Sequence, residues 1–156
     1  AGLLAEKQVE CVLGPLLREK PRRVVIANRT QARAEQLAAS HQQIAAETHV
    51  ELRVAALDAL DEDFDIVING TASSLAGAES PVPARVLRAS SLAYDMMYGA
   101  AAQGFMDWAT RHGAVARDGL GMLVEQAAES FALWRGVRPP ADQVLRELRA
   151  EIAAGR

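Results

Sequence analysis

Short apolar runs alternate along the chain with longer stretches in which apolar residues recur at helical spacing. The alternation predicts strands at 22–27, 50–55, 64–71, 91–97 and 113–117. It predicts helices at 3–20, 30–43, 100–112, 119–134 and 141–153, and a short helix at 81–88. Strands that alternate with helices indicate an α/β fold with a mostly parallel sheet and helices on both faces.

Polar residues follow three of the predicted strands where each strand ends. These strand ends are 28–30, 69–73 and 94–98. In an open parallel sheet, ligands bind in the crevice outside the carboxyl ends of the strands. The sequence therefore predicts that the three strand ends line one ligand-binding rim.

The end of the first of these strands carries the most informative polar group. Asn28 and Arg29 stand where folds that select NAD place Asp or Glu, which accepts a hydrogen bond from the ribose 2′-hydroxyl. An arginine fork suits a phosphate dianion instead. The pattern predicts a nucleotide site that prefers a 2′-phosphate, as in NADP. The alternative is an ordinary surface loop in which Thr30 is the N-cap of the next helix.

Composition narrows the class of protein. The 156 residues fit one globular domain, with 50% hydrophobic and 24% charged residues. The net charge of −3 does not favour a nucleic-acid or membrane-surface partner, and one cysteine excludes an internal disulfide. No apolar run approaches the roughly 20 residues of a membrane-spanning helix. We expect a soluble, cytoplasmic protein.

Four stretches together resemble the C-terminal, NADP-binding part of the shikimate dehydrogenase family. The resemblance covers the chain from about Val9 to its end, and the order and spacing of the stretches match. They are Asn-Arg-Thr-Gln-Ala-Arg at 28–33, Asp-Ile-Val-Ile-Asn-Gly-Thr at 65–71, Tyr-Asp-Met-Met-Tyr at 94–98 and Asp-Gly-Leu-Gly-Met-Leu-Val-Glu-Gln-Ala at 118–127. The resemblance implies a Rossmann-like fold and an oxidoreductase that reduces 3-dehydroshikimate to shikimate with NADPH, on the route to chorismate and the aromatic amino acids.

The resemblance also implies a set of cofactor-binding residues. Asn28, Arg29, Thr30 and Arg33 would hold the adenosine 2′-phosphate, and Arg29 would also stack on adenine. The turn with Asn69 and Thr71 would run past the dinucleotide. Met96 and Gly119 would contact the nicotinamide end.

Two residues are implied to bind the substrate. Tyr98 and Gln126 would hydrogen-bond the hydroxylated ring of shikimate. Each implied role has a plainer alternative: Tyr98 as a strand-end aromatic in water, Gln126 as a helix surface residue and Met96 as core packing. Asp118 is expected chiefly to cap the helix that begins near Gly119.

The chain departs from the family pattern in two ways. Lys7 and Lys20 do not lie in the family's proton-transfer motif, so no catalytic residue is assigned, and the family's preceding substrate domain is expected to be absent. Residues 1–8 replace the family's first strand and glycine-rich phosphate turn, so we expect the central strand to be missing. A truncated or incomplete sequence would explain this, as would a short paralogue that pairs the 22–27 and 64–71 strands directly.

These observations lead to one expected organisation. Residues 1–156 form an NADP-binding domain, with a core at about 9–117 and C-terminal helices at about 119–154. The chain alone is expected to be inactive, with a small-molecule substrate, no metal and a possible homodimer. Two alternatives remain: a non-catalytic NADP-binding or interaction fragment, and a quinate/shikimate dehydrogenase that accepts NAD.

Overall fold

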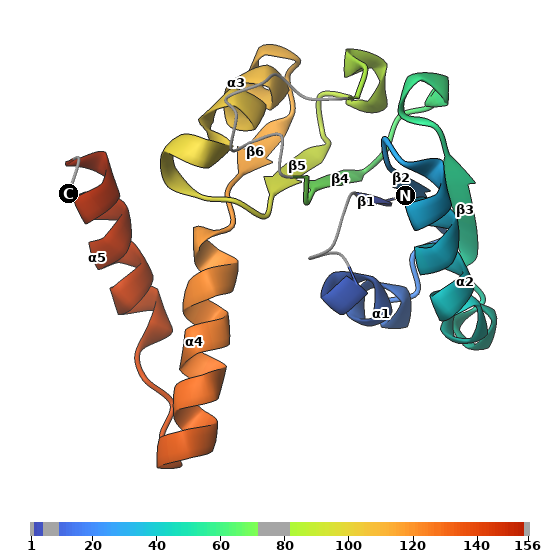
Figure 1. Ribbon diagram of the computed structural model, residues 1–156. Coiled ribbons are helices and arrows are strands. Elements are labelled where there is room, and N and C mark those ends of the chain that lie inside the picture. The colour runs from blue at the N-terminus through green and yellow to red at the C-terminus, as the bar shows by residue number, and fades with distance from the viewer. Residues whose placement is uncertain (1, 5–9, 72–81, 155–156) are drawn as a thin grey trace.

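Six parallel strands form one sheet at the centre of the molecule (Figure 1). The computed structural model describes residues 2–4, 10–71 and 82–154. The strand order is β3-β2-β1-β4-β5-β6, the order of a Rossmann sheet. Strands β2 and β3 are added on one side of β1, and β4, β5 and β6 are added on the other side. The strands are β1 (Gly2–Leu4), β2 (Arg23–Ala27), β3 (Glu51–Ala55), β4 (Ile66–Asn69), β5 (Leu92–Asp95) and β6 (Val115–Arg117).

Helices cover both faces of this sheet. The helices are α1 (Glu10–Arg18), α2 (Gln31–Thr48), α3 (Gln103–Arg111), α4 (Leu120–Arg135) and α5 (Ala141–Ala153), with 3₁₀ turns η2 (Leu57–Ala59), η4 (Ala84–Val86) and η5 (Gly99–Ala102). Strand β2 shows how the layers form, because its side chains alternate between the two faces. Val24 and Ile26 pack with α1 and α2, whereas Val25 packs in the cluster that contains Phe105 and Trp108 of α3.

The expectation that the central strand is missing is wrong. Gly2–Leu4 forms β1 and pairs in parallel with β2 on one side and with β4 on the other. The helix expected at 3–20 therefore begins only at Glu10. The backbone groups along the facing edges of β2 and β4 require a hydrogen-bonding partner, and a three-residue apolar strand supplies it. Direct pairing of β2 with β4 is excluded by the same register. The replacement for the glycine-rich turn, at residues 5–9, lies outside the described residues.

The other predicted elements are confirmed in position, but α2 continues to Thr48 and the short helix predicted at 81–88 is only a 3₁₀ turn. Each of the five predicted strands contains an observed strand, and the helices at 30–43, 119–134 and 141–153 are present. The helix predicted at 100–112 starts as the 3₁₀ turn η5 and continues as α3. The short helix predicted at 81–88 is the turn η4, and residue 81 lies outside the described residues. Residues 72–80 of the hydroxyl-rich loop also lie outside them.

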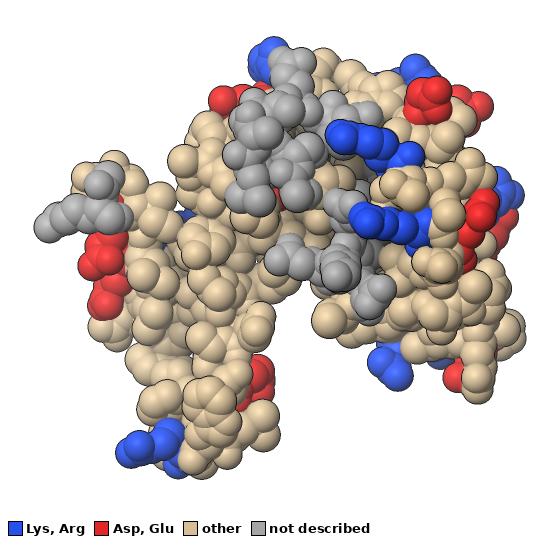
Figure 2. All heavy atoms as spheres, viewed as in Figure 1, with Lys and Arg blue, Asp and Glu red and all other residues tan. Residues whose placement is uncertain are grey.

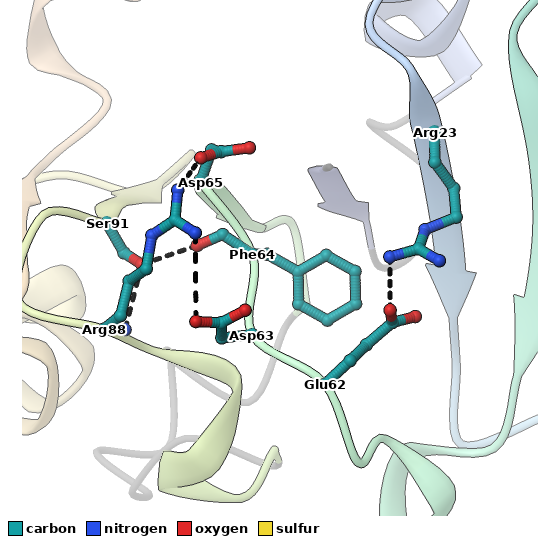
Figure 3. Close-up of polar contacts among 7 residues, drawn as sticks. All are labelled: Arg23, Glu62, Asp63, Phe64, Asp65, Arg88 and Ser91. Atoms are coloured by element: carbon teal, nitrogen blue, oxygen red, sulfur yellow. Dashed lines mark hydrogen bonds and ion pairs between the residues drawn. The ribbon is translucent and has the colours of Figure 1, made fainter.

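Ion pairs and a buried hydroxyl hold the amino edge of the sheet together (Figure 3). Arg23, at the start of β2, pairs with Glu62, and the Arg88 guanidinium pairs with Asp65. The buried Ser91 hydroxyl donates to the Phe64 carbonyl at 2.5 Å and accepts from the Arg88 amide N–H at 3.0 Å. These contacts fix the segments that lead into β4 and β5. They lie at the edge opposite the predicted ligand-binding rim.

Helices α4 and α5 lie side by side and extend away from the sheet (Figure 1). Val124 and Ala128 of α4 pack against Ala141 of α5. Three large apolar side chains near the far end of α4 and one just after the helix are exposed. They are Phe131, Leu133, Trp134 and Val137, and we call them the α4 apolar patch. Figure 2 shows a mostly uncharged surface in this part of the molecule, with acidic atoms beside the helix and basic atoms near its far end. Within the described residues, no helix is both long and apolar enough to cross a membrane.

Candidate functional site

The carboxyl end of β2 turns sharply at Asn28. The Asn28 side chain is buried, and its Oδ1 accepts a hydrogen bond from the backbone N–H of Thr30 at 3.0 Å. Asn favours such turns because its side chain mimics a backbone carbonyl. The turn leaves Arg29 and Thr30 exposed. Thr30 occupies the N-cap position of α2, but its side chain makes no capping hydrogen bond, so its hydroxyl is not committed to the helix.

A pocket of about 600 Å³ lies beside this turn, within the usual size range of small-molecule sites. Arg29 lies at the pocket and has no ion-pair or hydrogen-bond partner among the described residues. The opposite side comes from the segments after β3 and before η4. The full lining is Asn28, Arg29, Gln31, Ala56, Leu57, Asp58, Val82, Pro83 and Arg85.

Arg85 ties two segments of the pocket wall together. Its Nε donates to the Leu60 carbonyl at 2.6 Å, and its Nη2 donates to the Asp58 carbonyl at 3.0 Å. The turn η2 is therefore held against the segment that carries Val82 and Pro83, and the two form a largely apolar surface. A planar base fits between such a surface and a guanidinium, because both of its faces are then covered.

The ends of β4 and β5 are joined by buried polar groups. Asn69 Nδ2 donates to Asp95 Oδ2 at 3.1 Å, and the Met97 backbone N–H donates to Asp95 Oδ1 at 2.9 Å. Asn69 Oδ1 in turn accepts from the Thr71 N–H at 3.1 Å and from the Thr71 hydroxyl at 2.8 Å. The Asn69 and Thr71 side chains thus shape the turn at the end of β4.

Gly119 brings the start of α4 against the end of β5. Its N–H donates to the Met97 carbonyl at 2.8 Å. A Cβ at this position would lie 2.2 Å from the Met96 carbonyl oxygen, closer than any side chain tolerates, so only glycine fits. The resemblance implies that Gly119 contacts the nicotinamide end, and the structure shows that its backbone lies close to the Met96 carbonyl.

The remaining predicted site residues lie around this rim. The Met96 side chain is buried in the core cluster that contains Leu13 and Leu17 of α1. Arg33 is exposed on the first turn of α2. Tyr98 follows β5 and is 44% exposed, and Gln126 is exposed on α4. Within the described part of the chain, neither the Tyr98 hydroxyl nor the Gln126 amide has a hydrogen-bond partner.

Asp118 does not cap α4, contrary to the expectation. The N-cap is Gly119, with no side-chain capping bond, and Asp118 pairs instead with Arg149 of α5 at 2.8 Å.

Asp118 and Arg149 also lie close enough to Tyr94 of β5 to change the pKa of its phenol. Burial raises the pKa of the Tyr94 phenol above 10.0, and the nearby Asp118 carboxylate raises it further, against smaller lowering effects from the Met122 backbone and Arg149.

The family assignment is decided by matches over both halves of the chain. Residues 3–94 match the family model described as shikimate / quinate 5-dehydrogenase, and residues 119–149 match the shikimate 5′-dehydrogenase C-terminal domain. The chain belongs to the shikimate/quinate 5-dehydrogenase family. The resemblance carried by the four sequence stretches is therefore confirmed.

Individual family members are also similar in sequence to this chain. The NADP(+) shikimate dehydrogenase of Acidovorax sp. (strain JS42) is 66% identical over 144 residues, which cover 92% of this chain and 51% of that protein. The chain spans about half the length of the curated relatives it matches.

Two solved structures share the fold of this chain. The Ael1 enzyme from Pseudomonas putida is 41% identical, with a TM-score of 0.81 over 94% of this chain and 54% of that one. The shikimate 5-dehydrogenase of Thermus thermophilus, solved with NADP(H) and shikimate, is 27% identical, with a TM-score of 0.72 over 96% of this chain and 54% of that one.

The wall opposite Arg29 is the part of the site that sequence reasoning missed. Leu57 and Asp58 follow the end of β3, so the rule that ligands gather at carboxyl ends of strands points to them. Val82 and Pro83 follow no strand directly, and no local pattern marks them. They reach the pocket because η4 folds back toward η2, which is a tertiary contact.

Replacing Gly119 by alanine tests the close approach at the start of α4. Because the added Cβ would collide with the Met96 carbonyl, we expect Gly119→Ala to lower the free energy of unfolding by about 1–3 kcal/mol in urea denaturation. Gly121→Ala is the matched control, since a Cβ there meets nothing within 4 Å, and its effect should stay below about 1 kcal/mol. Equal stabilities of the two variants would contradict the contact.

The Tyr94 pKa can be measured by spectrophotometric titration of Tyr98→Phe, because the chain contains two tyrosines and this variant keeps only Tyr94. The midpoint should lie above 10.0. Since folding favours the neutral phenol, its contribution to stability is complete below pH 10.0 and is lost as the pH rises through the folded-state pKa. Tyr94→Phe should reduce this alkaline loss in urea denaturation. A native midpoint at or below 10.0 would contradict the burial of the phenol.

Proposed function

We propose that this chain is the nucleotide-binding part of an NADP-dependent shikimate dehydrogenase, an enzyme that reduces 3-dehydroshikimate to shikimate. One observation carries the proposal furthest. Arg29 has no partner among the described residues, stands at a pocket at the carboxyl end of β2, and replaces the acid that would select NAD. The relatives named NADP(+) shikimate dehydrogenases support it.

The residues present fit the adenosine end of NADP. The Arg29 guanidinium would pair with the 2′-phosphate and cover one face of adenine, while Leu57, Val82 and Pro83 would cover the other. Thr30 and Arg33 would add donors to the phosphate from the start of α2. A helix N-terminus favours an anion there as well, because its first N–H groups lack intrahelical partners.

The nicotinamide end would lie further along the rim. The turn shaped by Asn69 and Thr71 would border the dinucleotide, and the backbone around Met96 and Gly119 would face the reacting ring. NADPH, when bound, supplies a hydride to the ketone. Tyr98 and Gln126 would hold the hydroxyl groups of the substrate ring, because their polar side-chain atoms have no partner among the described residues.

The reduced ketone oxygen also requires a proton donor, because alkoxide charge develops as the hydride arrives. Lys20 cannot serve, since it follows α1 and precedes β2 at the amino edge of the sheet. We propose that the donor comes from a substrate domain, as the family resemblance implies. Residues 1–156 then act as one NADP-binding domain, with a core that includes β1 (Gly2–Leu4) besides about 9–117 and with C-terminal helices at about 119–154, and are inactive alone.

A second candidate function is a non-catalytic NADP-binding or interaction module. The α4 apolar patch favours it, because Leu133 and Trp134 are more than 80% exposed, at 84% and 82%. Such a module would self-associate, and a homodimer would bury the patch. A gel-filtration volume that does not change with concentration would count against this candidate. A quinate/shikimate dehydrogenase that prefers NAD is less well supported, because Arg29 and Arg33 favour a phosphate.

Replacing Arg29 by aspartate tests the NADP assignment. Arg29→Asp removes charge-assisted hydrogen bonds worth about 1.5–3 kcal/mol and adds repulsion of the 2′-phosphate, so the affinity for NADP should fall about 100-fold by isothermal titration calorimetry. The affinity for NAD should fall far less, because NAD loses only the contact of Arg29 with adenine.

Arg146→Asp is the matched control, because Arg146 lies exposed on α5 with no partner among the described residues. It makes the same charge change away from the pocket and should leave both affinities as they are. Equal losses of NADP and NAD affinity in Arg29→Asp would contradict the 2′-phosphate assignment.

A further inference from the structure

Asp95 is a fully buried carboxylate at the carboxyl end of β5. Its exposed fraction is 0%, so it cannot touch a ligand directly. Its two oxygens accept from different elements: Oδ2 from the Asn69 side-chain amide at 3.1 Å, and Oδ1 from the Met97 backbone N–H at 2.9 Å. Burying a carboxylate costs free energy of folding unless hydrogen-bond donors satisfy its oxygens. A carboxylate that is buried at the ligand-binding edge of the sheet is therefore a candidate for a specific structural role.

The hydrogen bonds of Asp95 connect the ends of three structural elements. Through Asn69, which accepts from the Thr71 N–H and hydroxyl, they reach the turn after β4. Through Met97, whose carbonyl accepts from the Gly119 N–H at 2.8 Å, they reach the start of α4. The Asn69 carbonyl also accepts from the Met96 N–H at 2.9 Å, which closes the connection between β4 and β5.

We propose that Asp95 is the positioning residue for the nicotinamide end of the site. The proposal rests on the NADP-binding function proposed above. Met97 directly precedes Tyr98, and Gly119 begins the helix that carries Gln126. A single carboxylate thus sets the backbone around the reacting ring together with both substrate-binding residues. The adenosine end, at Arg29 on the far side of β1, is held by Asn28 and Arg85 and does not depend on Asp95.

The chemistry of this pair makes a specific test possible. The Asp95→Asn substitution keeps nearly the same side-chain shape but replaces the acceptor Oδ2 with an NH₂ group. This NH₂ group would face the NH₂ group of Asn69, so two hydrogen-bond donors would oppose each other. Asn69→Asp places two carboxylates together instead. The double variant Asn69→Asp/Asp95→Asn restores the pairing in reverse. The new amide at position 95 would accept from the Met97 N–H through its oxygen and donate to the new carboxylate at position 69. That carboxylate would still accept from Thr71.

The experiment compares NADP with 2′,5′-ADP, which carries the adenosine 2′-phosphate but no nicotinamide. Calorimetry on the full chain should show that Asp95→Asn and Asn69→Asp each weaken NADP binding about tenfold, the effect of one lost buried hydrogen bond. Binding of 2′,5′-ADP should stay within about twofold, and the double variant should bind NADP within about threefold of the unmodified chain. Asp107→Asn, an exposed carboxylate on α3, should change neither ligand.

Several results would overturn the proposal. Equal losses for NADP and 2′,5′-ADP, without rescue in the double variant, would mean that Asp95 supports only the fold as a whole. Unchanged NADP binding in Asp95→Asn would mean that it positions nothing. An unmodified chain that binds 2′,5′-ADP and NADP equally tightly would also remove the assignment. If the unmodified chain binds neither ligand, the proposed function itself fails, and the role of Asp95 falls with it.

Hydrogen exchange on the unmodified chain provides a measurement that does not depend on a variant folding. NADP should slow exchange of the Met97 and Gly119 amides, whereas 2′,5′-ADP should leave both unchanged. Equal effects of the two ligands on these amides would contradict the proposal.

Discussion

The parallel pairing of β1 between β2 and β4 is the constraint on which the rest of the structure depends. Because all six strands run the same way, their carboxyl ends meet at one edge and their amino ends at the other. The carboxyl edge carries Asn28, Asn69 and Asp95, three of the four buried polar residues of the described chain. The fourth, Ser91, lies at the amino edge and closes it with local contacts (Figure 3). A ligand site at the carboxyl edge follows from this arrangement.

The two ends of the proposed nucleotide site are built by different physical means. At the adenosine end, a side chain turns the chain back on itself and leaves a guanidinium exposed beside an apolar wall. At the nicotinamide end, backbone segments are brought together by a buried carboxylate and by the absence of a Cβ at Gly119. The first arrangement suits recognition of a charged group, and the second suits close, rigid placement of a ring.

The sequence predicted the outer parts of the fold better than its centre. Strand β2 and its polar end could be predicted because the apolar run is long and the residues that follow favour turns. Strand β1 could not, because it has three residues and its two leucines also fit the helical spacing of the segment that follows. Its assignment depends on the unfilled edges of β2 and β4, which a local pattern does not contain.

The candidate site shows the same division. The exposed positions of Arg29, Tyr98 and Gln126 follow from their places at strand ends and on a helix. The requirement for glycine at position 119 and the ion-pair partner of Asp118 could not be predicted in this way. The first depends on the Met96 carbonyl and the second on Arg149, and the fold brings each of them close. Long-range contacts of this kind are the part that single-sequence reasoning lacks.

The NADP site at the carboxyl edge is tested most directly by a map of the backbone amide NMR signals that shift when NADP is added to the chain. Shifts are expected at Thr30, Thr71, Met97 and Gly119, and none at the pocket of about 460 Å³ on the amino edge, which Arg22, Glu62 and Asp65 line. Shifts confined to the amino edge, or no shifts at saturating NADP, would contradict a site at the carboxyl edge.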